Sequence, residues 1–322
     1  MPLFHVHGLL CGLLASLLAG SCVVLPTRFS ASTFWSDFVD TGANWYTAVP
    51  TIHQILLTVD RPSPMPQIRF IRSCSSALSP ATLAAIEDAF KAPVLEAYAM
   101  TEAAHQMTTN PLPPGSHKSG TVGTGHGVEV CILNERGEEL PAGVPGEVCV
   151  RGNNVTKGYI NNDKANRESF FRTEYGNCPP EFDGFLRTGD QGLKGEDGYL
   201  RLTGRIKELI NRSGEKISPL EVDAALLAIP GVQEAVSFAM PSDMYGEIVG
   251  ATVVLKDDAK HLEQATLQQA LSEKLIKFKI PERIWIVDSI PKTCVHADQC
   301  HRQDPAPYRG CRICRQVGPV LL

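Results

Sequence analysis

A carboxylate and a guanidinium stand 15 positions apart on the two sides of a predicted hairpin. Asp190 ends the run Arg187–Asp190 (RTGD), and Arg205 follows a second strand-like segment. Between them, Gly195–Gly198 (GEDG) is a turn signal. Across such a hairpin the two charges could grip the hydroxyls of a ribose from two sides. A surface hairpin with ordinary charges fits the spacing equally well.

A second candidate site follows a predicted strand at Val94–Tyr98. Thr101 and Glu102 place a hydroxyl beside a carboxylate, and such hard oxygens suit phosphate and Mg²⁺. A helix cap is the alternative for a Thr-Glu pair. Small residues at Ser73–Ala77 (SCSSA) follow another predicted strand and let a ligand approach the backbone closely. Both loops lie where ligands gather in α/β sheets, at the carboxyl ends of strands.

Longer runs around these residues resemble the adenylate-forming family of acyl-CoA synthetases, luciferases and peptide-synthetase adenylation domains. The runs are RTGD, GYLRLTGRIKELI, GEKISPLEVD and YAMTE, and the resemblance extends from residue 1 to about residue 293. Within the family, MPLFHVHG, IRSCSSAL and EAYAMTEAAH resemble the plant oxalate–CoA ligases, a group of 4-coumarate–CoA ligase-like proteins. The resemblance implies a ligase that converts an acid and ATP to an acyl-adenylate and then to an acyl-CoA. It also implies ATP, Mg²⁺ and coenzyme A.

By resemblance, one set of residues binds the nucleotide. Tyr98 packs on adenine and Thr101 meets a phosphate. Asp190 and Arg205 contact the ribose, and Glu102 binds magnesium. The residues expected at the ATP are Ser75, Ala97, Tyr98, Thr101, Asp190 and Arg205.

Two lysines complete the catalytic hypothesis. By resemblance, Lys207 is the hinge of a large domain rotation. Lys216 is a candidate contact for a phosphate or for CoA. The expected catalytic residues are Thr101, Glu102 and Lys216.

The acid substrate is expected to bind among His5, Ser75 and His105. His5 belongs to PLFHVHG, which resembles the family's PxFHxxG segment, whose histidine lines the acyl pocket. Three polar side chains with two possible cations suit a short, doubly charged acid. We therefore expect oxalate rather than a coumarate ring or a fatty chain.

The composition is that of a globular protein with no basic surface for nucleic acid. The 322 residues are 43% apolar and 20% charged, and the formal net charge is −5. We expect a monomer with small-molecule partners and no nucleic acid. Six of the ten cysteines are scattered, as buried reduced thiols would be. We expect a cytoplasmic location. The resemblance leaves peroxisomal association open, although the carboxyl-terminal SKL signal is missing.

Residues 9–25 form a nearly continuous apolar run. A signal peptide needs a basic start, yet no lysine or arginine precedes Arg28. The run divides at Gly20 and is short for a membrane-spanning helix. A signal peptide or anchor is the alternative, but we expect no membrane span. The pattern predicts a buried element made of a helix (8–19) and a strand (22–25).

Strand and helix signals alternate through residues 1–110, which predicts a parallel sheet with crossover helices. From about 120 to 203 the pattern is rich in strands and turns and predicts a compact β subdomain. The expected fold class is α/β. It comprises a partial large amino-terminal domain (1–203), a small mobile α+β domain (204–293) and an irregular, disordered tail (294–322).

Two departures from the family predict low activity. The family's phosphate loop, TSGTTxxPKG, supplies backbone donors to phosphate and has no counterpart before PLFHVHG. After Ile290–Thr293 the family's Gly-Lys pair is replaced by Cys294 and Val295. A zinc site at Cys311 and Cys314 is the alternative to a disordered tail. Two alternatives to a working ligase remain. One is a non-catalytic nucleotide-binding fragment or pseudoenzyme, and the other is an interaction module with a zinc tail.

Overall fold

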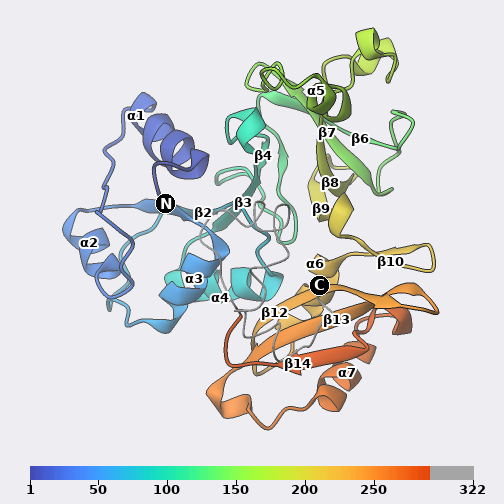
Figure 1. The fold of residues 1–322 in the computed structure, drawn as a ribbon. Helices are drawn as coiled ribbons and strands as arrows, with labels where there is room; N and C mark the ends of the chain where they lie inside the picture. The colour runs from blue at the N-terminus through green and yellow to red at the C-terminus, as the bar shows by residue number, and fades with distance from the viewer. Residues whose placement is uncertain (291–322) are drawn as a thin grey trace. The chain divides into compact units, whose positions relative to one another are not determined.

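The structure is a computed structural model that describes residues 1–290. The chain divides into two compact units, Met1–Ile206 and Lys207–Leu322 (Figure 1). In the described residues, the first unit holds two sheets and the second unit holds one. The expected α/β fold class is confirmed. The tail at 294–322, with its predicted disorder and its alternative zinc site, lies outside the described residues.

The first sheet of Met1–Ile206 begins with three parallel strands joined by helices. The elements in chain order are α2 Phe34–Asp40, β1 Trp45–Ala48, α3 Pro50–Thr58, β2 Phe70–Ser73, α4 Pro80–Phe90, β3 Val94–Tyr98, β4 Thr108–Thr109 and β5 Thr124–Gly125. Strands β1, β2 and β3 pair in parallel, whereas β4 and β5 extend the sheet antiparallel. Ser79 accepts a hydrogen bond from Thr82 N and Pro80 opens α4, so local signals set where this helix begins. The predicted parallel sheet is confirmed for β1–β3.

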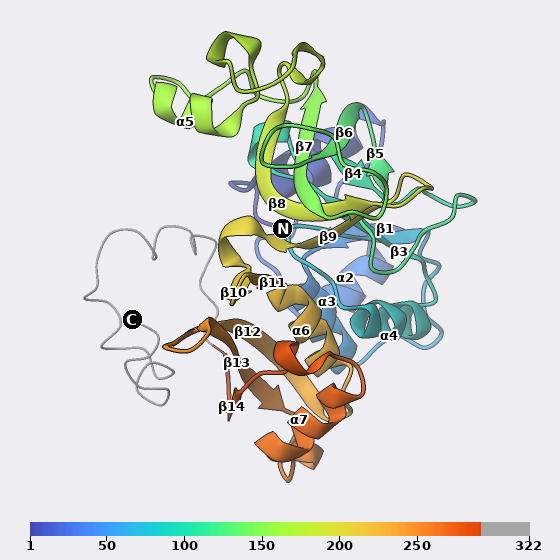
Figure 2. The same cartoon turned by 90° about the vertical axis from the view of Figure 1, so that its right-hand side faces the viewer.

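The two faces of this sheet carry different side chains, because residues alternate along a strand. Ile71 and Val94 are register partners and are buried in the apolar core formed with α2, α3 and α4. Thr47 and Arg72 are also register partners and point to the opposite face. The π-helix η1 (His7–Leu14) lies on that face, since His7 reaches Thr47 (Figures 1 and 2). The apolar core and the polar side chains therefore occupy opposite faces.

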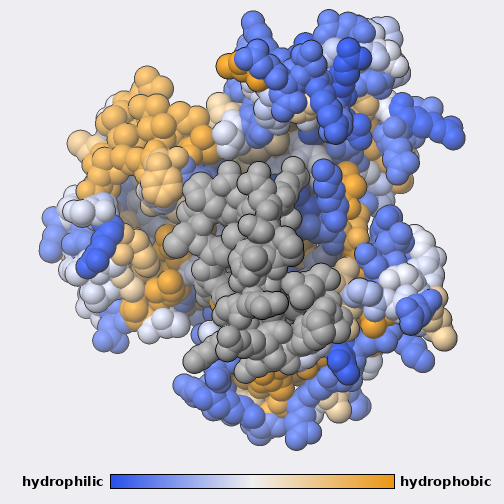
Figure 3. Space-filling view, in the orientation of Figure 1, coloured by the Kyte–Doolittle hydropathy of each residue, from blue (hydrophilic) through white to orange (hydrophobic). Residues whose placement is uncertain are grey.

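The amino-terminal apolar run differs from the prediction. Its helix is present as η1 followed by α1 (Ala15–Leu18), but residues 22–25 form no strand. Leu18 is 89% exposed and Leu25 is 53% exposed, so the prediction of a buried helix and strand is wrong. A strand needs partners for its backbone groups, and no described strand pairs with 22–25. Figure 3 shows apolar side chains gathered over η1 and α1. Within residues 1–290, every helix is too short or too polar to span a membrane.

Four antiparallel strands form the second described sheet of this unit. Its elements are β6 Val128–Leu133, β7 Gly146–Gly152, α5 Asp163–Ser169, β8 Leu186–Lys194 and β9 Leu200–Arg205. Gly195–Gly198 turns β8 into β9, and Gly198 adopts a φ of +80°, which favours glycine. The predicted hairpin is confirmed. Short 3₁₀ helices of this unit lie at Thr101–Ala103 (η2), Thr173–Tyr175 (η3) and Pro180–Phe182 (η4), and η5 (Ile206–Glu208) crosses into the next unit.

The unit that begins at Lys207 has a small α+β fold. Its elements are β10 Ile210–Arg212, β11 Glu215–Ile217, α6 Pro219–Leu227, β12 Val232–Ser242, β13 Gly246–Leu255, η6 Asp257–Ala259, α7 Gln264–Ser272, η7 Lys277–Lys279 and β14 Arg283–Ile286. The sheet runs β11-β10-β13-β12, and β14 joins β13 in parallel. Ser218 caps α6 by accepting from Glu221 N, and apolar side chains of α6, α7 and β13 form the core.

Candidate functional site

Asp190 lies where strands β3, β8 and β9 bring three polar side chains together. The register of the hairpin places Asp190 opposite Arg205, whose Nε lies 2.9 Å from Asp190 Oδ1. Tyr98, at the end of β3, donates its hydroxyl to Asp190 Oδ2 at 2.5 Å. The side chain of Asp190 is 13% exposed and that of Arg205 is 58% exposed. Two donors therefore fix the carboxylate, and it keeps lone pairs for further donors.

The backbone of RTGD holds this carboxylate in place. Thr188 donates its hydroxyl to Val148 O at 2.8 Å and accepts from the Asp190 N–H at 3.1 Å. Gly189 adopts a φ of +72°, so a glycine is favoured between them. Burial raises the pKa of Asp190, and the Tyr98 hydrogen bond and the Arg205 charge oppose this shift. When ionised, such a desolvated carboxylate is a strong acceptor for hydroxyl groups.

The arrangement differs from the predicted grip. The sequence predicts Asp190 and Arg205 on two sides of a ribose. In the structure the two side chains form an ion pair with each other, so a ribose would contact them side by side. Tyr98 is only 8% exposed, and its hydroxyl supports Asp190. Its contact with adenine stays a prediction. Sequence reasoning missed the support of Asp190, because Tyr98 and Asp190 are 92 residues apart and no local pattern links them.

Thr101 and Glu102 begin the short helix η2 directly after β3. This helix has no side-chain cap, so the alternative of a Thr-Glu cap is wrong. Tyr159 donates its hydroxyl to Glu102 Oε1 at 3.0 Å, and Thr156 N donates to the Glu102 carbonyl at 2.7 Å. Thr101 is exposed and Glu102 is half-buried.

The side chain of Glu102 fits a role in magnesium binding. Its carboxylate is accessible in part and offers the hard oxygen that Mg²⁺ prefers. Residues 1–290 contain no cluster of three or more His, Cys, Asp or Glu side chains that could hold a metal ion. Glu102 would therefore share the ion with oxygens of the nucleotide phosphates and with water, as is usual for Mg²⁺.

The predicted acid-binding residues lie together with a histidine that was not predicted. His7 Nδ1 lies 3.0 Å from Ser75 Oγ, and His7 Nε2 lies 2.6 Å from Thr47 Oγ1. Ser75 Oγ lies 3.4 Å from His105 Nε2. The rings of His7 and His105 stack with centroids 4.7 Å apart, and the His5 ring lies 6.2 Å from that of His105. We call His5, His7, Ser75 and His105 the histidine cluster.

Burial changes the charge state of two rings in the histidine cluster, His7 and His105. Burial lowers the pKa of His105 to about 4, and the positive charge of Arg72 adds to this shift. Burial, with a smaller contribution from His105, lowers the pKa of His7 to about 2. Both rings are neutral near pH 7, so His105 is not one of the two possible cations. Sequence reasoning groups His105 with Ser75, as the structure does, but it does not show that burial disfavours the charged form; the contact of His105 with an acid stays a prediction.

Arg72 is the cation beside this cluster, and it was also missed. Its side chain on β2 shares a sheet face with Thr47, and the residue is 8% exposed. Its Nη2 donates to Gln106 Oε1 at 3.4 Å, a long contact. Among residues 1–290, Nη1 has no hydrogen-bond partner, and none of the ion pairs in that part of the chain includes Arg72. A charged residue in the run Phe70–Ser73 (FIRS), within a buried parallel strand, is the signal that could have found it.

The remaining predicted residues offer less. Ala97 is 5% exposed and lies opposite Thr109, so only its backbone could meet a ligand. Lys207 is the first residue of the second unit, which suits a hinge, but its motion stays a prediction. Lys216 is exposed on β11, opposite Asn211, and its contact with phosphate or CoA also stays a prediction.

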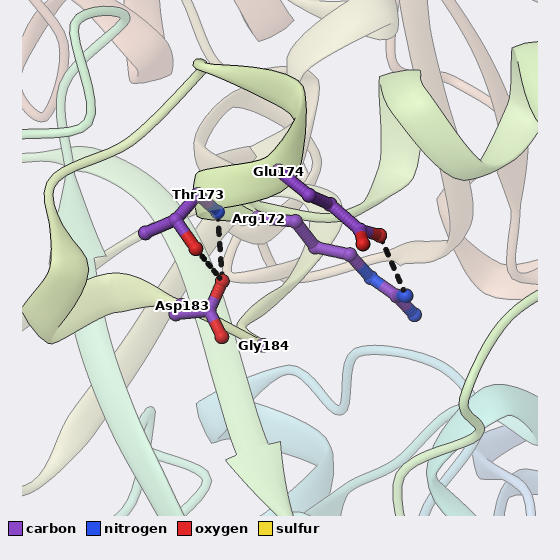
Figure 4. Close-up of a pocket in the computed structure, with 5 residues that line it drawn as sticks. All are labelled: Arg172, Thr173, Glu174, Asp183 and Gly184. Carbon is purple, nitrogen blue, oxygen red and sulfur yellow. Dashed lines mark hydrogen bonds and ion pairs between the residues drawn. The ribbon is translucent and has the colours of Figure 1, made fainter.

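Two surface cavities lie apart from the predicted residues. The smaller, of about 200 Å³, is lined by Arg172, Thr173, Glu174, Asp183 and Gly184. Figure 4 shows its polar side chains bonded to one another: Arg172 pairs with Glu174, and Asp183 accepts from Thr173. The larger, of about 340 Å³, shares Arg172 and Gly184 with it. Neither cavity includes a residue of the histidine cluster or Asp190.

Comparison with known families accounts for these motifs. Residues 1–160 match the family described as AMP-binding enzyme, and residues 221–295 match the AMP-binding enzyme C-terminal domain. The chain belongs to this family. Its acyl-CoA synthetase resemblance is therefore confirmed.

Curated relatives include two oxalate–CoA ligases. The chain is 53% identical to the one from Saccharomyces cerevisiae over 293 residues, which are 91% of this chain and 52% of that protein. It is 52% identical to the one from Arabidopsis thaliana over 299 residues, which are 91% of this chain and 56% of that protein. The chain thus spans about half the length of the curated relatives it matches.

Solved structures of the family have the same fold. ATP-bound MatB from Rhodopseudomonas palustris superposes with a TM-score of 0.80 at 30% identity, over 91% of this chain and 56% of that one. The o-succinylbenzoate–CoA synthetase MenE from Bacillus subtilis, in complex with ATP and magnesium, gives 0.76 at 31% identity, over 91% of this chain and 57% of that one.

Proposed function

We propose that this chain belongs to an acid–CoA ligase that makes an acyl-adenylate from ATP and a small carboxylic acid and then transfers the acyl group to CoA. The observation that carries the proposal is Asp190, a buried carboxylate held by Tyr98 and Arg205. Such an acceptor, with a cation beside it, suits the paired hydroxyls of a ribose. The family match and the ATP-bound relatives support the same ligand.

The reaction has two steps whose atoms balance. A carboxylate oxygen of the acid attacks the α-phosphorus of ATP, and pyrophosphate leaves. The sulfur of CoA then attacks the acyl carbon, AMP leaves and the thiol proton passes to solvent. Both steps need fixed partners for phosphate charge. We assign Thr101 to a phosphate oxygen, and Glu102 would hold Mg²⁺, which would supply positive charge to the phosphate oxygens.

The acid we propose is oxalate. The histidine cluster is a compact polar site at the carboxyl ends of β2 and β3, which is where substrates of α/β enzymes bind. Its imidazole and hydroxyl groups can form hydrogen bonds to the carboxylates of a short acid. Two relatives that are more than half identical to this chain carry oxalate in their names.

A release assay tests this function. Chain 1–322 is incubated with ATP, Mg²⁺ and oxalate, and pyrophosphate is measured with and without CoA. Oxalate-dependent pyrophosphate release supports the ligase. AMP binding by calorimetry without any release supports the second candidate, a non-catalytic nucleotide-binding protein. That candidate is favoured by one observation: Asp190, Tyr98 and Arg205 all belong to Met1–Ile206 and form their contacts within it.

A further inference from the structure

Arg72 is a buried cation that lacks a counter-charge. The residue is 8% exposed, its Nη1 has no hydrogen-bond partner in residues 1–290, and its Nη2 reaches only a neutral amide at 3.4 Å. Removing a charge from water without a partner costs several kcal/mol, so a buried charge is normally paired. An anion bound at Arg72 would supply the missing counter-charge.

The described groups around Arg72 supply no negative charge. His7 and His105 are neutral near pH 7 because burial lowers their pKa. Cys11 and Cys74, which also feel the charge of Arg72, remain thiols because burial raises their pKa. The His105 Nδ1 atom likewise has no hydrogen-bond partner in the described residues. Two buried nitrogens, one on Arg72 and one on His105, therefore lack partners, and the charge of Arg72 acts on His105.

We propose that Arg72 determines the substrate class by binding the second carboxylate of a dicarboxylic acid, an inference that rests on the proposed function. One carboxylate of the acid must stay free to attack the α-phosphorus. The other meets Arg72, whose planar guanidinium suits a carboxylate, while Ser75 and His105 bond to the acid. Because the guanidinium of Arg72 carries a full positive charge, it selects a dianion over a monoanion of the same shape.

Oxamate is the matched probe for this charge. It has nearly the shape of oxalate, but a neutral amide replaces one carboxylate. Chain 1–322 is titrated with oxalate and with oxamate by calorimetry, as wild type, Arg72→Gln and Arg72→Lys. Arg69→Gln, an exposed arginine three positions earlier, is the control substitution. AMP titration of every variant reports on the nucleotide site.

We expect the wild type to bind oxalate about 10- to 100-fold more tightly than oxamate, the scale of a charge-assisted bond. Arg72→Gln should lose this preference through a fall in oxalate affinity alone, whereas Arg72→Lys should keep part of it. AMP affinity and the Arg69→Gln titrations should not change. Without oxalate, the unfolding midpoint of Arg72→Gln should equal or exceed that of the wild type, because a buried unpaired charge has been removed.

Four results would overturn the inference. A wild-type preference for oxalate that persists in Arg72→Gln would show that another group reads the second charge, and the proposed function would survive. A wild type that binds oxalate and oxamate equally would show that the second charge is not recognised, and the proposed function would again survive. AMP binding without any binding of either acid would remove the acid site itself, and with it both proposals. If Arg72→Gln fails to fold and folded Arg72→Lys prefers oxalate to oxamate as strongly as the wild type does, Arg72 has a structural role instead.

Discussion

Neutralising Asp190 should weaken nucleotide binding without weakening the fold. Asp190→Asn keeps the shape of the side chain and an oxygen that can accept from Tyr98, but it removes the negative charge. A hydrogen bond to a charged group contributes about 1.5–3 kcal/mol and a neutral one about 0.5–1.5 kcal/mol. The difference, about 1–1.5 kcal/mol, predicts a loss of about 5- to 13-fold in AMP affinity. Asp190→Ala removes both oxygens and should cost about 10- to 150-fold.

Without ligand, Asp190→Asn should be at least as stable as the wild type. Burial raises the pKa of Asp190 in the folded state. A raised carboxyl pKa favours folding at low pH, and this contribution is lost as the pH rises through the folded pKa. Ionised Asp190 is therefore a cost near neutral pH, and Asp190→Asn removes it. We expect its unfolding midpoint at pH 7 to be no lower than that of the wild type.

The assay is calorimetric titration of AMP into wild type, Asp190→Asn and Asp190→Ala, with thermal unfolding of each. Asp197→Asn is the matched control, because Asp197 is an exposed acid in the turn of the same hairpin and pairs with Lys118. It should leave AMP affinity unchanged. Equal affinity for AMP in the wild type and both Asp190 variants would refute the ribose assignment. A loss of affinity that appears only together with unfolding would refute the claim that charge, rather than structure, is responsible.

Three further predictions follow from other side chains. Ser75→Gly removes the hydroxyl between His7 and His105, at a position with a φ of +74° that favours glycine. Calorimetry should show oxalate affinity falling about 2- to 10-fold, and thermal unfolding should show a midpoint that is unchanged or higher. Unchanged oxalate binding would contradict the assignment. Glu102→Gln should raise the Mg²⁺ concentration for half-maximal pyrophosphate release about tenfold, and an unchanged Mg²⁺ dependence would exclude Glu102 as the ligand. Burial raises the pKa of Asp223 to about 6, so its contribution to stability is present below the unfolded value near 3.8 and is lost as the pH rises through 6. Urea unfolding should show wild type losing on the order of 1–3 kcal/mol against Asp223→Asn between pH 4 and 7, and parallel profiles would contradict this.

The sequence predicts a structural feature correctly where the cause of that feature lies within a few neighbouring residues. Ser79 and Pro80 start α4 because a cap and a fixed φ act within one turn. Gly198 ends a tight turn because few other residues adopt its φ. The strand expected at 22–25 failed for the opposite reason. Its apolar residues satisfy the pattern, but a strand exists only where another strand pairs with it, and pairing is not written in the segment itself.

The site divides along the same line. Motifs in the sequence place Asp190 and Arg205 on one hairpin and group Ser75 with His105, and the structure brings the members of each pair close together. The direct ion pair between Asp190 and Arg205 was not predicted. They do not predict the Tyr98 hydroxyl on Asp190, because that contact depends on how β3 meets the second sheet. The sequence also does not predict the charge state of the His105 ring, because its low pKa follows from burial rather than from its neighbours in the chain.

Two buried charges in Met1–Ile206 are treated in opposite ways, and the difference separates their roles. Asp190 has a donor on each oxygen before any ligand arrives, so a ligand that binds it adds bonds to a carboxylate already fixed. Such an arrangement positions a neutral group, for example a hydroxyl, with little gain in net charge. Arg72 has no counter-charge in the described residues, so whatever binds it must bring one. A neutral ligand would leave the cost of that buried charge in place, and only an anion removes it. If both proposals hold, Asp190 offers a fixed, charged acceptor to neutral hydroxyl groups, whereas Arg72 requires a ligand that is itself charged.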